Sequence, residues 1–556
     1  MLRILLGRAR TGKSARVLEE IRALGDSSQQ ILLVPEHASH VAEVDVCRAC
    51  GPTASRHAEV LTFKLLASRV LTLTGGAAEV TLDNGGKLLL LQRVLVSLAP
   101  SLRVYRRPSQ RAAFLESLLA LIEELQAYAV APEVLAEKAE AIAGESGERL
   151  RDVALLYGAY LAKLHEGGRD ARDRLEKLEE NLAASGYADD KDIFLDGFSY
   201  FTGRERNILR ILLKRAKSVT VTLLGDGSDS ELFAEGLRVR EQLYALARDA
   251  GVPCTEEVLR GGAPRDALGH VEKHFFGGNV RWDEPTEQLR LYEASTAYDE
   301  AERIAAEILR LVRCEGYRFR DITVTSRDMD AAEPVLRTVF ARCGIPLYCA
   351  RRSDILRRGV PALLLGALDA VSGGFEYEDV FRCLKTGLAG LSAEECDLLE
   401  NYVIKWDIRG AMWTRDVPWT AHPEGYGVPW RTEHEEMLAR VNAAREKVRA
   451  PLSHLYEGVR GTGDVEGKVT ALYNYLTEIA LPEELQRQTE TLWQRGETQR
   501  AEELAQLWNV LCGVLDQFVE MLGGTELDAE EFARLMRLVL TQYSVGTIPV
   551  SLDRVS

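Results

Sequence analysis

The stretch from Gly7 to Ser14 constrains the fold of this chain more than any other part of the sequence. It reads GRARTGKS and matches the pattern G-x-x-x-x-G-K-[ST]. An apolar run precedes it and a helix-forming segment to about Leu24 follows, which is the strand–loop–helix context that such a loop requires. Backbone N–H groups of the loop and the N-terminus of the following helix then face phosphate groups. The sequence therefore predicts a phosphate-binding loop at the end of the first strand of an α/β domain.

The chemistry of the loop defines a candidate site for ATP and Mg²⁺. Lys13 would reach the β- and γ-phosphates, and Ser14 would coordinate the metal ion. A partner carboxylate is expected at the end of another strand, and Asp196 follows the apolar run 193–195. The other interpretation of Asp196 is a turn residue at a strand end. The predicted nucleotide-binding residues are Gly7, Arg8, Thr11, Gly12, Lys13, Ser14 and Asp196, with Ser14 and Asp196 on the Mg²⁺ side.

The residue after Asp196 argues against rapid hydrolysis. Helicase-type ATPases carry a glutamate there to orient or deprotonate the attacking water, and this chain has Gly197. Asp226 ends the strand predicted at 218–226 without a following glutamine, and a plain turn residue is an equally good interpretation of it. We therefore expect nucleotide binding with little or no turnover by this chain. An autonomous ATPase would need a carboxylate from elsewhere, such as Glu205.

Alternating patterns predict two α/β regions, each interrupted by helices. Strands are expected first at 2–6, 31–36, 192–196 and 218–226, and then at 289–295 and 321–328. With two or three strands, the second sheet looks incomplete. The predicted boundaries are 1–85 plus 186–284 for the first domain, 86–185 for its helical insertion, 285–356 resuming at 545–556 for the second domain, and 357–544 for its helical insertion.

Composition narrows the class of protein. The 556 residues are 46% hydrophobic and 28% charged, which is an ordinary globular balance. No apolar run reaches the ~18 residues that span a bilayer, so we expect a cytoplasmic protein without a membrane segment. The nine cysteines lack zinc-site spacing and are expected to be reduced thiols. The net charge of −16 argues against a surface that is basic all over, but it is compatible with a local basic groove that binds DNA.

Several segments together resemble the B subunit of the bacterial ATP-dependent helicase–nuclease AddAB, also called RexB. The resemblance covers essentially the whole chain. It rests on GRARTGKS at 7–14, VPEHASHVAEV at 34–44, EVLTFKLLASRVL at 59–71, DIFLDGFSYFTGRERNIL at 192–209, EGYRFRDITVTSRD at 315–328, GIPLYCARRSDILRRGVPAL at 344–363, ENYVIKWDIRGAMW at 400–413 and SVGTIPVSLDRVS at 544–556.

The resemblance implies a superfamily-one helicase scaffold of two RecA-like P-loop domains that has lost helicase action. In the family, the B subunit pairs with an AddA-like motor subunit in a heterodimer that acts on duplex ends and single-stranded DNA in double-strand-break repair and recombination. The B subunit is thought to scan single strands for a Chi-type hotspot sequence. Of the residues in this chain, the resemblance assigns only Gly7, Gly12, Lys13, Ser14 and Asp196 to nucleotide binding. His37 departs from the glutamine expected in the VPEQ-like stretch.

Family members are about twice as long as this chain. Their C-terminal half completes the second RecA-like domain and adds a nuclease domain with an iron–sulfur cluster held by four cysteines. The cysteines here do not occupy those positions, so we expect neither a cluster nor nuclease activity in this chain. The interpretation is an N-terminal portion of a longer protein.

Basic residues near aromatic ones are the candidates for DNA contacts, because single strands are gripped by phosphate contacts and base stacking. A solvated charged face is the competing interpretation for each cluster. Two further hypotheses for the whole chain stay open: an autonomous DNA-stimulated ATPase or translocase, and a structural interaction protein with a vestigial loop. The candidate DNA-binding residues are Tyr105, Arg106, Arg107, Arg351 and Arg352.

Overall fold

The computed structural model forms two compact units, and each is described by itself. The first comprises Met1–Thr81, Leu102–Tyr105 and Ser117–Leu291, and the second Leu82–Ser101, Arg106–Glu116 and Tyr292–Ser556. The residues that the structure describes are 1–51, 53–75, 82–106, 112–166, 174–228, 231–260, 266–276, 278, 280–349, 353–354, 358–461, 463–545 and 553–555.

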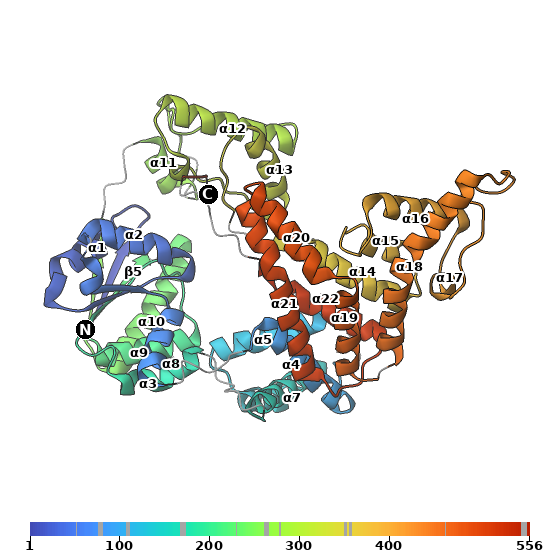
Figure 1. Ribbon diagram of the computed structural model, residues 1–556. Helices are drawn as coiled ribbons and strands as arrows, with labels where there is room; N and C mark the ends of the chain where they lie inside the picture. The colour runs from blue at the N-terminus through green and yellow to red at the C-terminus, as the bar shows by residue number, and fades with distance from the viewer. Residues whose placement is uncertain are drawn as a thin grey trace. The chain divides into compact units, whose positions relative to one another are not determined.

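A six-stranded sheet forms the centre of the first unit (Figure 1). Its strand order is β3-β2-β4-β5-β1-β6. Every neighbouring pair is parallel, with Leu2 opposite Val219 and Ile193 opposite the same valine. All carboxyl ends of the strands therefore meet at one edge, where α/β proteins bind ligands. The strands are β1 (Leu2–Gly7), β2 (Gln30–Leu33), β3 (Ala58–Leu61), β4 (Asp192–Leu195), β5 (Ser218–Leu224) and β6 (Cys254–Val258).

Helices cover both faces of this sheet, which explains why all four residues of β2 and of β4 are buried. On one face α1 (Lys13–Leu24) and α2 (Ser39–Cys50) pack over Leu5. On the other face Leu2, Ile4 and Leu6 meet four helices. These four are α3 (Phe63–Thr74), α8 (Arg174–Ser185), α9 (Gly203–Arg215) and α10 (Ala234–Ala250).

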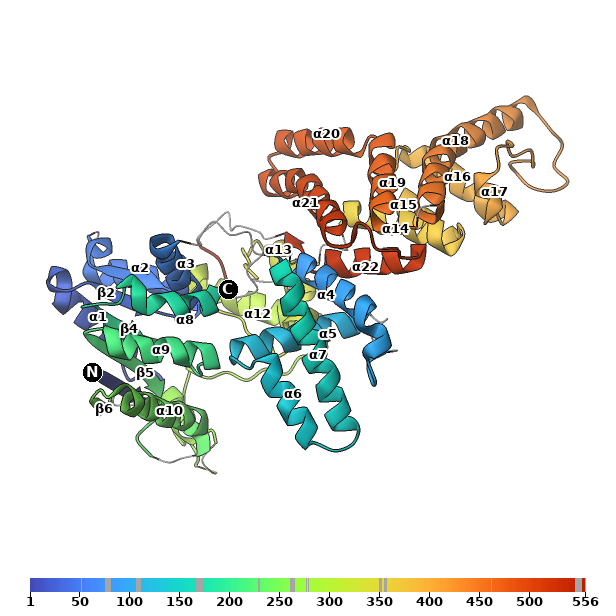
Figure 2. The same ribbon diagram turned by 90° about the horizontal axis from the view of Figure 1, so that it is seen from below.

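A helical excursion separates β3 from β4, as expected for an interrupted α/β domain. Its part in the first unit includes α6 (Pro132–Ala141) and α7 (Glu145–Glu166), which pack side by side (Figure 2), and the end of α5 (Ala112–Ala127). Arg204 at the start of α9 is 9% exposed and donates to the carbonyl oxygen of Gln126 near the end of α5. A Cβ at Gly203 would lie 2.5 Å from the carbonyl oxygen of Tyr128. Glycine thus permits a close backbone approach between α9 and the end of α5.

The second unit is mainly helical. α14 packs against α15, α18 and α22, while α4 from the early part of the chain packs against α21 and α22. Its helices are α4 (Asn84–Leu98), α12 (Ala297–Cys314), α13 (Met329–Arg342), α14 (Gly359–Gly373), α15 (Tyr377–Leu384), α16 (Ala393–Trp406), α17 (Ala411–Thr414), α18 (Thr432–Gly461), α19 (Val465–Glu478), α20 (Leu481–Gln494), α21 (Thr498–Leu522) and α22 (Ala529–Thr541).

The strands predicted at 289–295 and 321–328 do not form, and this prediction is wrong. Both runs are irregular, and Leu291 is 98% exposed. Within the described residues neither run has a neighbouring strand that could supply a hydrogen-bond ladder. A high β propensity alone does not form a strand without such a partner. Helices α12 and α13 instead share a small core with Ile345 and Val555. The strand pairing described there is a single parallel bridge from Leu347 to Val555 and the short antiparallel pair β7 (Ser353–Asp354) with β8 (Ser544–Val545).

Candidate functional site

The loop between β1 and α1 is tight and enters the helix through residues with positive φ. Gly12, directly before α1, has a φ of 86°, and Arg10 also has a positive φ of 60°. A Cβ at Gly7 would lie 2.2 Å from Oγ1 of Thr11, so the loop closes tightly only with glycine there. No side chain of the described residues caps the N-terminus of α1. Its first N–H groups and the positive end of its dipole are therefore offered to an anion.

Lys13 folds back onto this loop. Its Nζ donates to the carbonyl oxygens of Gly7 at 2.7 Å and Arg8 at 2.8 Å. Burial lowers the pKa of Lys13, and the negative charge of Asp196 offsets part of that effect. The ammonium group is thus held beside the loop by weak carbonyl partners, which a phosphate oxygen can replace with a stronger charge-assisted bond.

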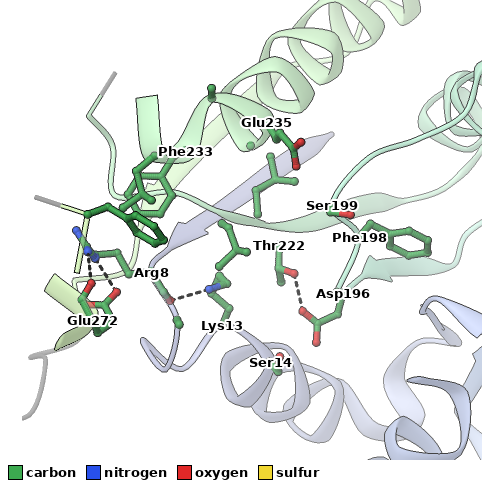
Figure 3. Close-up of a pocket in the computed structure, with 18 of the residues that line it drawn as sticks. Arg8, Lys13, Ser14, Asp196, Phe198, Ser199, Thr222, Phe233, Glu235 and Glu272 are labelled. Atoms are coloured by element: carbon green, nitrogen blue, oxygen red, sulfur yellow. Dashed lines mark hydrogen bonds and ion pairs between the residues drawn. The ribbon is translucent and has the colours of Figure 1, made fainter. Parts of the chain in front are cut away.

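Asp196 and Thr222 meet at the carboxyl edge of the sheet, from β4 and β5. Thr222 Oγ1 donates to Asp196 Oδ1 at 2.5 Å, and the N–H of Asp196 donates to the carbonyl of Leu33 at 3.0 Å. Ser14 on α1 lines the same pocket as these two residues (Figure 3). A carboxylate with two hydroxyl groups is an oxygen donor set that suits Mg²⁺. The residues present therefore fit a metal ion held by a nucleotide.

These side chains open into one pocket of about 910 Å³ in the first unit. Its polar groups include Lys13, Ser14, Asp196 and Thr222 from the loop, α1 and the ends of β4 and β5. The segment 231–236 at the start of α10 and the end of α11 (Ala267–His274) with the two residues after it supply three phenylalanines and three carboxylates. The lining residues are Arg8, Ala9, Lys13, Ser14, Asp196, Gly197, Phe198, Ser199, Thr222, Leu223, Leu224, Glu231, Leu232, Phe233, Ala234, Glu235, Gly236, Val271, Glu272, Phe275 and Phe276.

Comparison with known proteins assigns the chain to a family. The family model described as "ADDB, N-terminal" matches residues 4–272, which contain the loop, Asp196 and most of α11. The chain is 31% identical over 572 residues to the B subunit of the ATP-dependent helicase/deoxyribonuclease of Acetivibrio thermocellus, covering 100% of this chain and 50% of that protein. The chain belongs to the AddB family.

Other relatives carry the same name. The protein from Caldanaerobacter subterraneus subsp. tengcongensis is 31% identical over 570 residues, with 100% of this chain and 49% of that protein covered. The protein from Clostridioides difficile is 29% identical over 579 residues, with 100% and 50% covered. The chain thus spans about half the length of the curated AddB relatives that it matches.

Arg8 lines the pocket of this AddB-family chain, but its guanidinium is bound to protein groups. Its Nε donates to Glu272 Oε1 at 2.9 Å, and a terminal nitrogen lies 3.3 Å from Asp226 Oδ2. The same guanidinium lies over the ring of Phe233 at 5.3 Å. Asp226 also accepts from the backbone N–H of Ser228, which is the hydrogen bond of a turn residue. Arg8 therefore connects the loop with α11.

The carboxylates that line the pocket are not all those that the sequence suggested. Gly197 has a φ of 82°, so a side chain at this position would be strained. Glu205 accepts from the N–H of Thr202 at 2.8 Å in a capping box at the start of α9 and is not among the lining residues. Glu231 and Glu235 are lining carboxylates that sequence reasoning missed, since they follow no motif.

The candidate DNA-contacting residues are only partly described. The N–H of Tyr105 donates to Oδ2 of the buried Asp152 at 3.1 Å, and that carboxylate also accepts from two preceding N–H groups. The boundary between the units falls between Tyr105 and Arg106. The remaining three candidates lie outside the described residues: Arg107, Arg351 and Arg352.

Two further kinds of feature are absent from the described residues. No helix in the described part of the chain is both long and apolar enough to cross a bilayer. Within the same residues, no group of three or more histidine, cysteine, aspartate or glutamate side chains is arranged to hold a metal ion.

Proposed function

We propose that this chain binds ATP with Mg²⁺ in the pocket at the carboxyl edge of the six-stranded sheet. The observation that carries the proposal is the convergence of Lys13, Ser14 and Asp196 on one pocket, although Asp196 lies more than 180 residues along the chain. Lys13 and the N–H groups of α1 would hold phosphate oxygens. Ser14 and Asp196 would hold Mg²⁺, which supplies charge neutralisation to the phosphates.

The experiment is a calorimetric titration of Mg²⁺–ATP into the purified chain and into Lys13→Ala. Replacing Lys13 removes the only ammonium among the described residues that line the pocket, so we expect binding to weaken at least tenfold or disappear. Lys214→Ala is the matched control, because Lys214 is an exposed lysine on α9 that does not line the pocket. Equal binding by wild type and Lys13→Ala would contradict the proposal.

We propose further that the chain holds ATP with little or no hydrolysis. The support is Gly197 at the position where a helicase-type ATPase carries its catalytic glutamate, together with the capping role of Glu205. The alternative of an autonomous DNA-stimulated ATPase requires another carboxylate, and Glu235 lines the pocket. Phosphate release measured with and without single-stranded DNA separates the two. Rapid release that Glu235→Gln abolishes would establish the alternative.

The role that we propose for the whole protein is that of a non-motor subunit in an ATP-dependent helicase–nuclease. The support is membership of the AddB family, whose matched relatives are named as the B subunit of an ATP-dependent helicase/deoxyribonuclease. Such a protein would work with an AddA-like motor, bind single-stranded DNA and scan it for a Chi-type sequence during break repair and recombination. We expect no nuclease activity and no iron–sulfur cluster in the present chain. The vestigial-loop hypothesis fails if Lys13→Ala abolishes nucleotide binding.

The architecture of two RecA-like domains of a superfamily-one scaffold belongs to the same proposal. The first has its support in the parallel sheet, with the helical excursion between β3 and β4. For the second, α12 and α13 would be its helices, and the parallel bridge from Leu347 to Val555 supports a strand pairing there. The helices from α14 to α22 would form the second insertion.

A further inference from the structure

The pocket extends well past the groups that would hold phosphates. At about 910 Å³ it is larger than a triphosphate needs, and its lining includes, besides carboxylates, apolar side chains from the segments around α10 and α11. Three of these are aromatic: Phe233, just before α10, and Phe275 and Phe276, just after α11. We call these three residues the aromatic wall.

Phe275 and Phe276 are not core residues. They are 71% and 79% exposed, and their ring centroids lie 4.9 Å apart in an edge-to-face arrangement. Large aromatic side chains exposed together at a pocket mark a binding surface, because their faces gain free energy when a ligand covers them. The other phenylalanine in the pocket, Phe198, is partly buried against Phe63 and Phe201 and belongs to the core.

Arg8 of the phosphate loop contacts Phe233 of the aromatic wall and the helix that precedes Phe275 and Phe276. From the loop, Arg8 donates to both the side chain and the backbone carbonyl of Glu272, which precedes Phe275 by three residues. The same guanidinium lies over the ring of Phe233 (Figure 3). One loop side chain thus contacts Phe233 directly and Glu272 near the end of the helix that precedes Phe275 and Phe276. These contacts hold Phe233 and the end of α11 beside the loop.

We propose that the aromatic wall binds the base of a purine nucleoside triphosphate whose phosphates lie on the Gly7–Ser14 loop. This inference rests on the proposed function. A purine offers the larger π-face, and stacking on aromatic rings tolerates different bases. The wall therefore supplies affinity rather than a choice between adenine and guanine. ATP and GTP are expected to bind within a few-fold of each other, and both more tightly than a bare triphosphate.

The test compares Mg²⁺–ATP with Mg²⁺–tripolyphosphate in the wild-type chain and in Phe275→Ala/Phe276→Ala. Stacking is worth about 1–3 kcal/mol per base, so removing both rings weakens ATP binding on the order of 5- to 150-fold. Tripolyphosphate affinity is expected to stay unchanged, because the loop is intact. The matched control is Tyr298→Ala, which removes a 56% exposed aromatic ring from α12 outside the pocket.

Phe275→Trp adds a readout that a merely structural role would not give. Its fluorescence should be quenched by ATP and GTP but not by tripolyphosphate, and its ATP affinity should stay near that of wild type. ATP affinity unchanged in the double alanine variant would overturn the inference. So would an equal loss of ATP and tripolyphosphate binding, since the rings would then hold the loop rather than the base. A wild-type chain that binds neither ligand overturns the proposed function as well.

Discussion

The sheet of the first unit and the α12–α13 region of the second contain similar strand-forming sequence runs. Only the run in the first unit forms a strand. The runs 192–195 and 321–325 both place isoleucine and other strand-forming residues after a charged residue. In the first unit that run pairs on both sides, with β2 and β5, and Leu195 is fully buried. In the second, Ile322 and Val324 are partly buried against α12 and α13 without a ladder among the described residues. A strand-forming sequence forms a strand only where neighbouring strands supply hydrogen bonds and other elements bury its side chains.

The largest expected difference in stability between the two regions comes from truncating one apolar side chain in each. Leu195→Ala removes a side chain with no exposed surface, and we expect it to destabilise the first unit by about 2–5 kcal/mol. Val324→Ala removes a partly buried side chain and should cost less than about 1.5 kcal/mol. Hydrogen exchange read by mass spectrometry on peptides from each region measures both. Equal losses of protection would contradict the distinction.

A smaller effect is expected from matched charged contacts. Arg204 has a side chain only 10% exposed and forms ion pairs with Glu176 at 3.1 Å and Glu179 at 3.2 Å. Replacing it with methionine keeps most of its packing and should cost about 1–3 kcal/mol in the first unit. Arg342 pairs with Glu302 between α13 and α12, but both side chains are more than half exposed.

Arg342→Met is therefore the control for Arg204→Met, and no measurable loss is expected from it, because water screens an exposed pair. The readout is exchange protection at the α8–α9 contact and at the α12–α13 contact. If Arg342→Met loosened its contact as much as Arg204→Met loosens the other, solvent exposure would not be what separates the two regions.

The parts of the molecule that the sequence could predict are those where local pattern and tertiary setting agree. The loop and strands β1, β2, β4 and β5 combine buried apolar runs with a recognisable turn. Strand β6 reads CTEEV, with three polar residues, because it lies at the sheet edge and is only partly buried. Strand β3 has only four residues. Neither carries a periodic signal strong enough to identify from sequence.

The apolar half of the pocket could not be predicted for a different reason. Phe275 and Phe276 line the same pocket as Lys13 only because α11 lies near the loop, where Glu272 forms an ion pair with Arg8. No motif links residue 8 with residue 272. The strand prediction at 289–295 fails for the opposite reason, since the local pattern is present there and a partner strand is absent from the described residues.

The smallest expected effect is a loss of folding stability at low pH that depends on Asp192, the first residue of β4. Burial raises the pKa of the Asp192 carboxyl, but hydrogen bonds from Ser218 and Ser28 and the ammonium of Lys217 outweigh this, so its pKa is lowered overall. A carboxyl whose pKa is lower in the folded state stabilises that state above its unfolded pKa of about 4, and this stabilisation is lost as pH falls through the folded value. Between pH 6 and pH 3 the wild-type first unit should therefore lose more stability than Asp192→Asn, which has no proton to gain there. Urea unfolding of both proteins across that range, followed at first-unit peptides by exchange, measures the difference. Identical acid slopes would mean that the hydrogen bonds from Ser218 and Ser28 do not favour the charged carboxylate, and the start of β4 would then resemble the exposed segments of the second unit in its response to pH.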